Sequence, residues 1–133
     1  MSLNRIFEIS ASAMRAQGQR LNVVASNLAN ADAVAGPDGE AYKARQVVFK
    51  SLAEQNEPGG VKVSDVVEVQ TPGRRVFNPG HPLADETGFV THSNVNVVEE
   101  MVNMISASRA YQNNAEIMNT TQQLMLKTLQ LGQ

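Results

Sequence analysis

The side chains that most often do chemistry in proteins are few in this sequence. The two histidines, His81 and His92, lie in its middle third, and Asp85 and Glu86 are the carboxylates closest to them. Zinc sites need three or four ligands at characteristic spacings, and this set does not have such a spacing. Solvated loop histidines are the favoured interpretation, and a small metal-dependent hydrolase that uses both histidines is the alternative.

Other catalytic patterns are absent from the sequence. It contains no Gly-x-Ser-x-Gly, no His-Glu-x-x-His and no phosphate-binding glycine loop. Residues 36–39 read Gly-Pro-Asp-Gly, but Pro37 lacks the backbone N–H that a phosphate loop would donate, so a turn is predicted. Cysteine is absent, which excludes disulfides and thiolate chemistry. The sequence predicts a protein that is not an enzyme and holds no cofactor or metal.

Composition narrows the remaining classes. The 133 residues carry a net charge of -2 and no run of Lys or Arg beyond Arg74-Arg75, which argues against nucleic acid as a partner. No apolar run reaches 18 residues, so insertion into a membrane is not expected. The first 30 residues lack the basic start and apolar stretch of a cleaved secretory signal. Aromatic residues make up 5% of the chain and Trp is absent, which favours an elongated shape built on helix seams over a thick core.

A helix over residues 3–29 is the first predicted element that could position a functional surface. Its apolar residues recur at a seven-residue interval, at Phe7, Met14, Leu21 and Leu28. A complementary set three or four residues away completes a coiled-coil-like stripe and consists of Leu3, Ser10, Gln17 and Val24. Gly18 lies in the middle of this helix, and close approach of another helix and tolerated flexibility both remain open as its reason.

A second helix is predicted over residues 96–130. Asn96 followed by Glu99 resembles a capping box, and Gly132 lies just past the expected end. One heptad set contains Val97, Met104, Tyr111, Met118 and Met125, and the complementary set contains Met101, Ser108, Ala115, Gln122 and Leu129. The methionines follow helical spacing, so they are interpreted as packing groups rather than metal ligands.

The middle of the chain has a different pattern. Short strands are predicted at 46–49, 61–69, 74–77 and 89–95, separated by turns rich in Pro and Gly. Residues 61–69 alternate with period two, which predicts one buried face on a small sheet. The predicted fold is mainly α: residues 1–30 and 96–133 form an antiparallel coiled-coil hairpin with both termini at one tip, and residues 31–95 form a small β-rich or irregular middle region.

Both predicted helices carry more apolar surface than a hairpin can bury. Polar residues such as Ser10 and Gln122 weaken the seam between them, so burial against other subunits would have to offset the entropy of ordering. We therefore expect an assembly protein whose terminal helices are largely disordered in the free subunit. The expected assembly interface comprises Leu3, Phe7, Met14, Leu21, Val24, Leu28, Val97, Met101, Met104, Tyr111, Ala115, Met118, Met125 and Leu129.

Two long motifs in these helices resemble a known family. Residues 16–31, AQGQRLNVVASNLANA, and residues 100–114, EMVNMISASRAYQNN, are similar to the paired terminal signatures of bacterial flagellar axial proteins, which include rod, hook and hook-associated proteins. Residues 36–49, GPDGEAYKARQVVF, and 78–85, NPGHPLAD, resemble the middle region of its proximal rod branch. The Thr-Pro-Gly-Tyr-like turn that often follows the first motif in the wider family is replaced by Ala31-Asp32 and the Gly-Pro-Asp-Gly turn, which is typical of this branch.

The resemblance implies a structural subunit of the rod that crosses the periplasm, transmits torque and surrounds the export channel. Its partners would be other copies of itself, neighbouring rod proteins and, in transit, the flagellar type III export apparatus, which needs no cleaved signal. A helical needle or adaptor subunit of another secretion system is the alternative, although it would lack the paired terminal motifs and the β-rich middle region.

Overall fold

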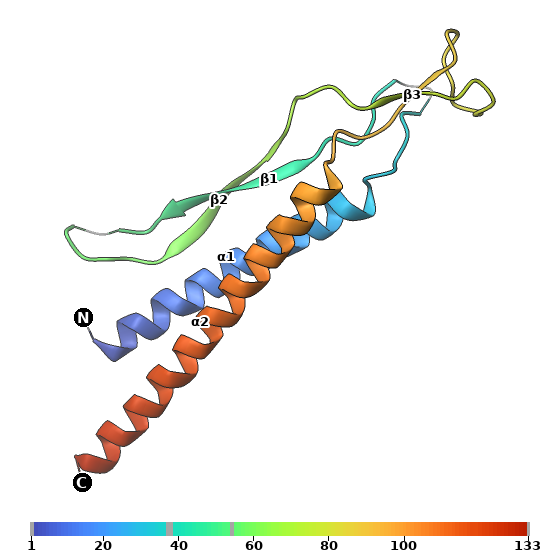
Figure 1. The fold of residues 1–133 in the computed structure, drawn as a ribbon. Helices are drawn as coiled ribbons and strands as arrows, with labels where there is room; N and C mark the ends of the chain where they lie inside the picture. Colours follow the sequence, from blue (N-terminus) through green and yellow to red (C-terminus); the bar gives the residue numbers. More distant parts are fainter. Residues whose placement is uncertain (1, 37–38, 54, 133) are drawn as a thin grey trace.

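Two long helices and two short β-ribbons make up the fold. The computed structural model describes residues 2–36, 39–53 and 55–132, so the central residues of the predicted Gly-Pro-Asp-Gly turn lie outside the described part. The element order is α1 (Leu3–Ala29), β1 (Arg45–Ser51), β2 (Val61–Glu68), β3 (Arg75–Phe77), β4 (Phe89–Thr91) and α2 (Val97–Leu131). Figure 1 shows the helices side by side, with the β1–β2 ribbon along α1. The β3–β4 ribbon lies beyond the end of α1 and the start of α2.

Both helices begin at residues that satisfy their free amide groups. The Ser2 side chain accepts a hydrogen bond from the backbone N–H of Arg5, and the Asn96 side chain accepts one from Glu99. Glu99 and Glu100 lie in the first turn of α2, where negative charge is favourable. The predicted limits of both helices are confirmed to within a residue.

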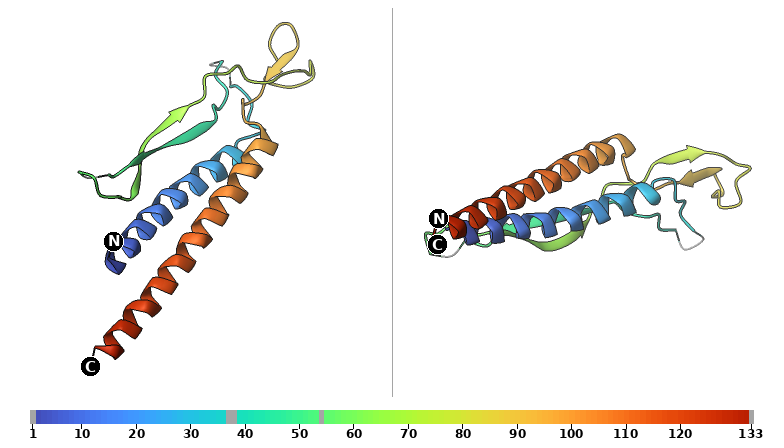
Figure 2. Two further views of the ribbon diagram at one scale, coloured as in Figure 1. Left: turned by 60° about the vertical axis from the view of Figure 1, so that its left-hand side comes forward. Right: turned by 90° about the horizontal axis from the view of Figure 1, so that it is seen from below.

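The helices run antiparallel, and both termini lie at the end of the hairpin away from β3 and β4 (Figure 2). Small side chains make the close packing: Ala16 and Ala107 are buried, Ala107 completely. α2 has 35 residues and α1 has 27, so α2 projects past the start of α1 (Figure 1). A mainly α fold with a small antiparallel β region is confirmed, whereas supercoiling of the helices and the three-part division of the chain stay predictions.

In one of the two predicted heptad sets of α2, Ser108 and Ala115 are half-buried and the other members are exposed. The residues buried in this helix are Glu100, Ala107 and Thr121, and each precedes by one position a member of the predicted set at 101, 108 and 122. Met101 is 54% exposed and Leu129 68% exposed. Positions that differ by one residue point about 100° apart around a helix. The side of α2 that carries the small Ala107 therefore packs against α1, and the side that carries the larger Met101 does not.

The strands form two separate two-stranded ribbons. β1 pairs antiparallel with β2, with a register shift between Val48 and Phe49, and β3 pairs antiparallel with β4. The predicted buried face of residues 61–69 is only partly correct: Val61 and Val63 are half-buried, whereas Val67 is exposed. The fourth strand ends at Thr91 rather than at residue 95. Among the described residues, the β1–β2 ribbon rests on α1 alone, so only part of its length is buried.

The chain exposes far more surface than a compact protein of its mass. Its accessible surface is 9226 Å², whereas a folded monomer of 14.4 kDa is expected to expose about 6,800 Å². The difference of roughly 2,400 Å² equals or exceeds the total area buried in a standard protein–protein interface.

Candidate assembly interface

The residues singled out for metal chemistry do not gather in the described structure. Within residues 2–36, 39–53 and 55–132, no three His, Cys, Asp or Glu side chains come together as a metal site. His81 has a local role, because its Nδ1 accepts a hydrogen bond of 3.0 Å from the backbone N–H of Leu83. His92 joins the backbone of Val34 in an isolated β-bridge.

The polar centre of the fold is Asn27, which is completely buried near the end of α1. Its Nδ2 donates to the carbonyl oxygen of Arg45 at 2.8 Å and to Oε2 of Glu100 at 3.1 Å. Its Oδ1 accepts from the Tyr42 hydroxyl at 2.9 Å and from the backbone N–H of Arg45 at 3.0 Å. All four hydrogen bonds that an amide side chain can make are formed, and they join α1, the start of β1 and α2. We call these four residues the Asn27 clasp.

A second polar centre joins the middle region to the entry of α2. Asn94 accepts from the backbone N–H of Ala44 at 2.6 Å and donates to the carbonyl oxygens of Val69 and Thr71. The buried Ser93 hydroxyl donates to the carbonyl oxygen of Ala31 at 2.6 Å. These bonds fix the course of the chain where it leaves α1 and where it returns into α2.

Ser12 and Arg5 of α1 also hold the β1–β2 ribbon against the helix. Ser12 Oγ accepts from the backbone N–H of Val61 at 3.1 Å. Arg5 donates to the carbonyl oxygen of Pro58 and forms an ion pair with Glu57. Arg5, Ser12 and Asn27 lie on one side of α1 at helical spacing, so the ribbon follows this side of the helix along most of its length.

The structure divides the predicted interface residues into two groups. Ten of them are buried or half-buried, namely Leu3, Phe7, Met14, Leu21, Val24, Leu28, Met104, Ala115, Met118 and Met125. The other four are exposed, namely Val97, Met101, Tyr111 and Leu129. Tyr111 and Met118 line an open groove with Gly18, and a Cβ added at Gly18 would touch nothing within 4 Å. Close helix approach at Gly18 within the chain is therefore wrong.

The face of α2 that points away from α1 is apolar at its start. Val98, Val102 and Ile105 share one side of the helix and are 71%, 60% and 60% exposed. The residues buried at Glu100 and Ala107 lie on the opposite side. Exposed apolar stripes of this kind mark interaction surfaces.

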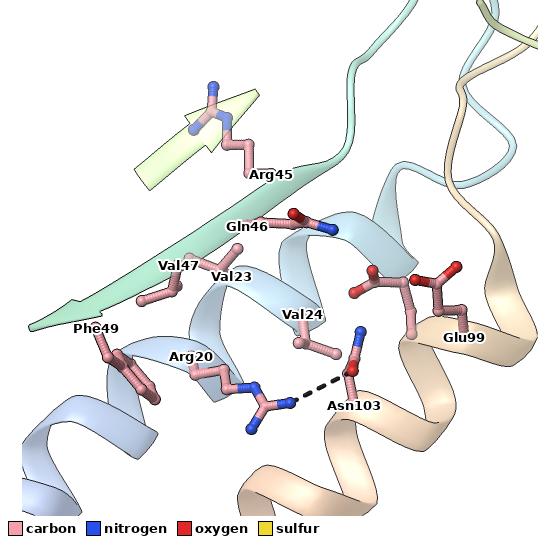
Figure 3. Close-up of a pocket in the computed structure, with 10 residues that line it drawn as sticks. Arg20, Val23, Val24, Arg45, Gln46, Val47, Phe49, Glu99 and Asn103 are labelled. Atoms are coloured by element: carbon pink, nitrogen blue, oxygen red, sulfur yellow. Dashed lines mark hydrogen bonds between the residues drawn. The ribbon is translucent and has the colours of Figure 1, made fainter. Parts of the chain in front are cut away.

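A groove of about 310 Å³ separates the start of α2 from β1. Figure 3 shows Val23 of α1 beside Val47 of β1, whereas Val24 of α1 points toward Asn103 of α2. Phe49 of β1 and Glu99 of α2 also line the groove. Arg20 reaches across to Asn103, with its Nη2 3.4 Å from Oδ1. The charged residues that line it are Arg20, Arg45, Glu99 and Glu100, and the Arg45 side chain points away from α2 (Figure 3). In the part of the chain that the structure describes, Arg20, Arg45 and Glu99 form no ion pair.

Comparison with known proteins identifies this arrangement of paired terminal helices. Residues 7–37 match the flagella basal body rod protein family, and residues 86–131 match the C-terminal region of the flagellar basal body rod FlgEFG proteins. The flagellar basal-body rod protein FlgC of Escherichia coli O6:H1 is 59% identical over the full length of both chains, and that of Salmonella typhimurium is 58% identical over the same extent. FlgC of Buchnera aphidicola from Acyrthosiphon pisum is 43% identical, again over both full lengths. The chain belongs to the FlgC family.

Membership in the FlgC family makes the chain a structural subunit of the flagellar basal-body rod. The predicted resemblance to flagellar rod proteins is therefore confirmed. Asn27 and Glu100 each lie within one of the two matched segments, so the clasp joins the two parts of a FlgC chain that the family descriptions cover separately. No helix in the described ranges is long and apolar enough to cross a membrane.

The sequence reasoning missed the polar residues of this FlgC chain that matter most for its architecture. Asn27, Glu100 and Asn94 were not among the predicted site residues, because a search for heptads counts apolar positions. The available signal was the position of Glu100 one turn before Met104, which places a carboxylate in the seam.

Proposed function

We propose that the chain polymerises through α1 and α2 into the proximal, periplasm-crossing part of the rod, where it transmits torque and surrounds the export channel. The observation that carries this proposal is the excess of exposed surface, concentrated in apolar side chains of α2. A solitary protein would leave these side chains in water, whereas packing against other subunits removes them from it.

In the assembled rod, α1 and α2 pack as a coiled coil with the helices of other copies and of neighbouring rod proteins. The subunit works by packing alone, without catalysis or a cofactor. It passes through the flagellar type III export apparatus before assembly. The polar residues between α1 and α2 suit this route, because a weak seam leaves the helices easy to unfold for passage.

The test is motility in a bacterium whose own copy of the gene has been deleted. Met104→Asp and Leu21→Asp place a charge in the helix seam, and we expect both to abolish swimming while the subunit is still synthesised, as judged by immunoblot. Val102→Asp is the sharper variant, because Val102 is 60% exposed and its substitution spares the packing within the chain. His81→Ala serves as the control and is expected to swim normally.

The three Asp variants distinguish packing within the chain from packing between chains. Loss of swimming in Val102→Asp, with the variant subunit still exported, supports an interface on the outward face of α2. Normal swimming of Val102→Asp would contradict an interface on that face, and normal swimming of all three would contradict assembly through the helices.

A further inference from the structure

The end of α2 is left without a partner inside its own chain. Leu124, Leu126, Leu129 and Leu131 are between 46% and 87% exposed, because α2 is eight residues longer than α1. Leu124, Lys127 and Leu131 follow one another at i, i+3 and i+7, so they share one side of the helix. This side offers two apolar side chains with a cation between them. We call residues 124–131 the α2 end.

The α2 end also lacks positive charge where a helix favours it. The last carbonyl oxygens of a helix have no partners within the helix and carry partial negative charge. The last turn of α2 contains no basic residue, and the cap accounts for one carbonyl, Thr128, which accepts from the N–H of Gly132. A partner with exposed guanidinium groups would complement this end.

The groove between α2 and β1 has the matching chemistry. Its apolar surface consists of Val23, Val24, Val47 and Phe49, and its charged side chains include Arg20 on α1 and Glu99 on α2. A leucine pair fits the apolar surface, Glu99 matches a lysine, and Arg20 matches the carbonyl end of a helix.

We propose that the groove between α2 and β1 binds the α2 end of a second copy of this chain. Leu124 and Leu131 of that copy pack on the valines and Phe49, and its Lys127 pairs with Glu99. Arg20 lies against the final carbonyl groups of its α2. The inference rests on the proposed function, because it specifies one of the contacts through which the subunits assemble.

The same chain cannot make this contact with itself. Asn103 lines the groove, and 26 residues of continuous helix separate it from Leu129, which places the two about 39 Å apart. A disulfide requires Cα atoms closer than about 7 Å. Since the chain contains no cysteine, an engineered disulfide between the groove and the α2 end can form only between two copies.

The experiment uses the double variant Val47→Cys/Leu129→Cys, expressed as the only copy in motile cells and exposed to an oxidant. We expect a ladder of covalent oligomers on a non-reducing gel. The matched control is Val76→Cys/Leu129→Cys, whose first cysteine lies at an exposed position on β3, together with each single variant. A yield for the groove pair no higher than for these controls overturns the proposal.

A charge exchange tests the pairing in the same cross-linking background. Glu99→Lys alone and Lys127→Glu alone are each expected to lower the cross-linked yield about two- to fivefold, as expected for an exposed ion pair. The double exchange is expected to restore the yield, and failure to restore it removes the Glu99–Lys127 contact. Loss of swimming in Val102→Asp without cross-linking of the groove pair rejects this contact alone, whereas unimpaired swimming of all the seam and face variants rejects the proposed function.

Discussion

Replacing Asn27 with Ala removes the central residue of the clasp and takes a hydrogen bond from each of its partners. The backbone N–H and C=O of Arg45, the Tyr42 hydroxyl and the Glu100 carboxylate each lose one bond. A buried polar group left unpaired costs about 1–3 kcal/mol. Because the groove beside Glu100 and Arg45 admits water to part of the cluster, we expect a total near the cost of one or two such groups, about 3 kcal/mol.

This loss is measurable as a shift of the melting temperature. For a chain of this size, about 1 kcal/mol corresponds to roughly 4 °C, so Asn27→Ala is expected to melt about 12 °C below the original chain. The assay is circular dichroism at increasing temperature in trimethylamine N-oxide. This osmolyte strengthens effective burial, so a concentration is chosen at which the original chain shows a complete transition.

The matched control is Asn30→Ala, three residues further along the chain. Asn30 is half-buried at the end of α1, and its Nδ2 donates to the carbonyl oxygen of Ser26 four residues earlier, so its loss is expected to cost less than about 1 kcal/mol. If the two alanine variants melt within about 2 °C of each other, the clasp does not join the two helices and the ribbon as described.

Three further predictions concern other parts of the molecule. Gly60→Ala is expected to destabilise the contact between the β1–β2 ribbon and α1 by roughly 1–3 kcal/mol, because the new Cβ would collide with Ser12 Oγ. Gly18→Ala is instead expected to stabilise α1 by up to about 1 kcal/mol. Equal melting temperatures of the two variants would contradict both expectations. Hydrogen bonds from the Thr87 hydroxyl and from the backbone N–H of Phe89 lower the pKa of Asp85, so the Asp85 loop is expected to be stable above about pH 4 and to loosen as the pH falls through the lowered pKa. Amide exchange of Phe89 measures this, and an exchange rate unaffected by Asp85→Asn would refute it. The free subunit in dilute solution is expected to show much less helix by circular dichroism than α1 and α2 comprise, and a cooperative, highly helical monomer would be the contrary result.

The local features of the fold could be predicted from the sequence. Helix limits depend on capping groups within a few residues, so Ser2, Asn96 and the uninterrupted apolar spacing fix where α1 and α2 begin and end. The turns rich in Pro and Gly likewise mark the ends of the short strands. Each terminal motif is a continuous stretch of sequence that runs along one helix, so the sequence alone is enough to identify the family.

Tertiary structure alone decided which sides of the helices meet. A heptad pattern on α2 allows two neighbouring stripes about 100° apart, and the choice depends on which one packs closely against α1. The structure selects the stripe with the fully buried Ala107 and with Glu100, whose carboxylate is acceptable there only because Asn27 donates to it. That partner lies 73 residues away in the chain, so no local pattern could have revealed it.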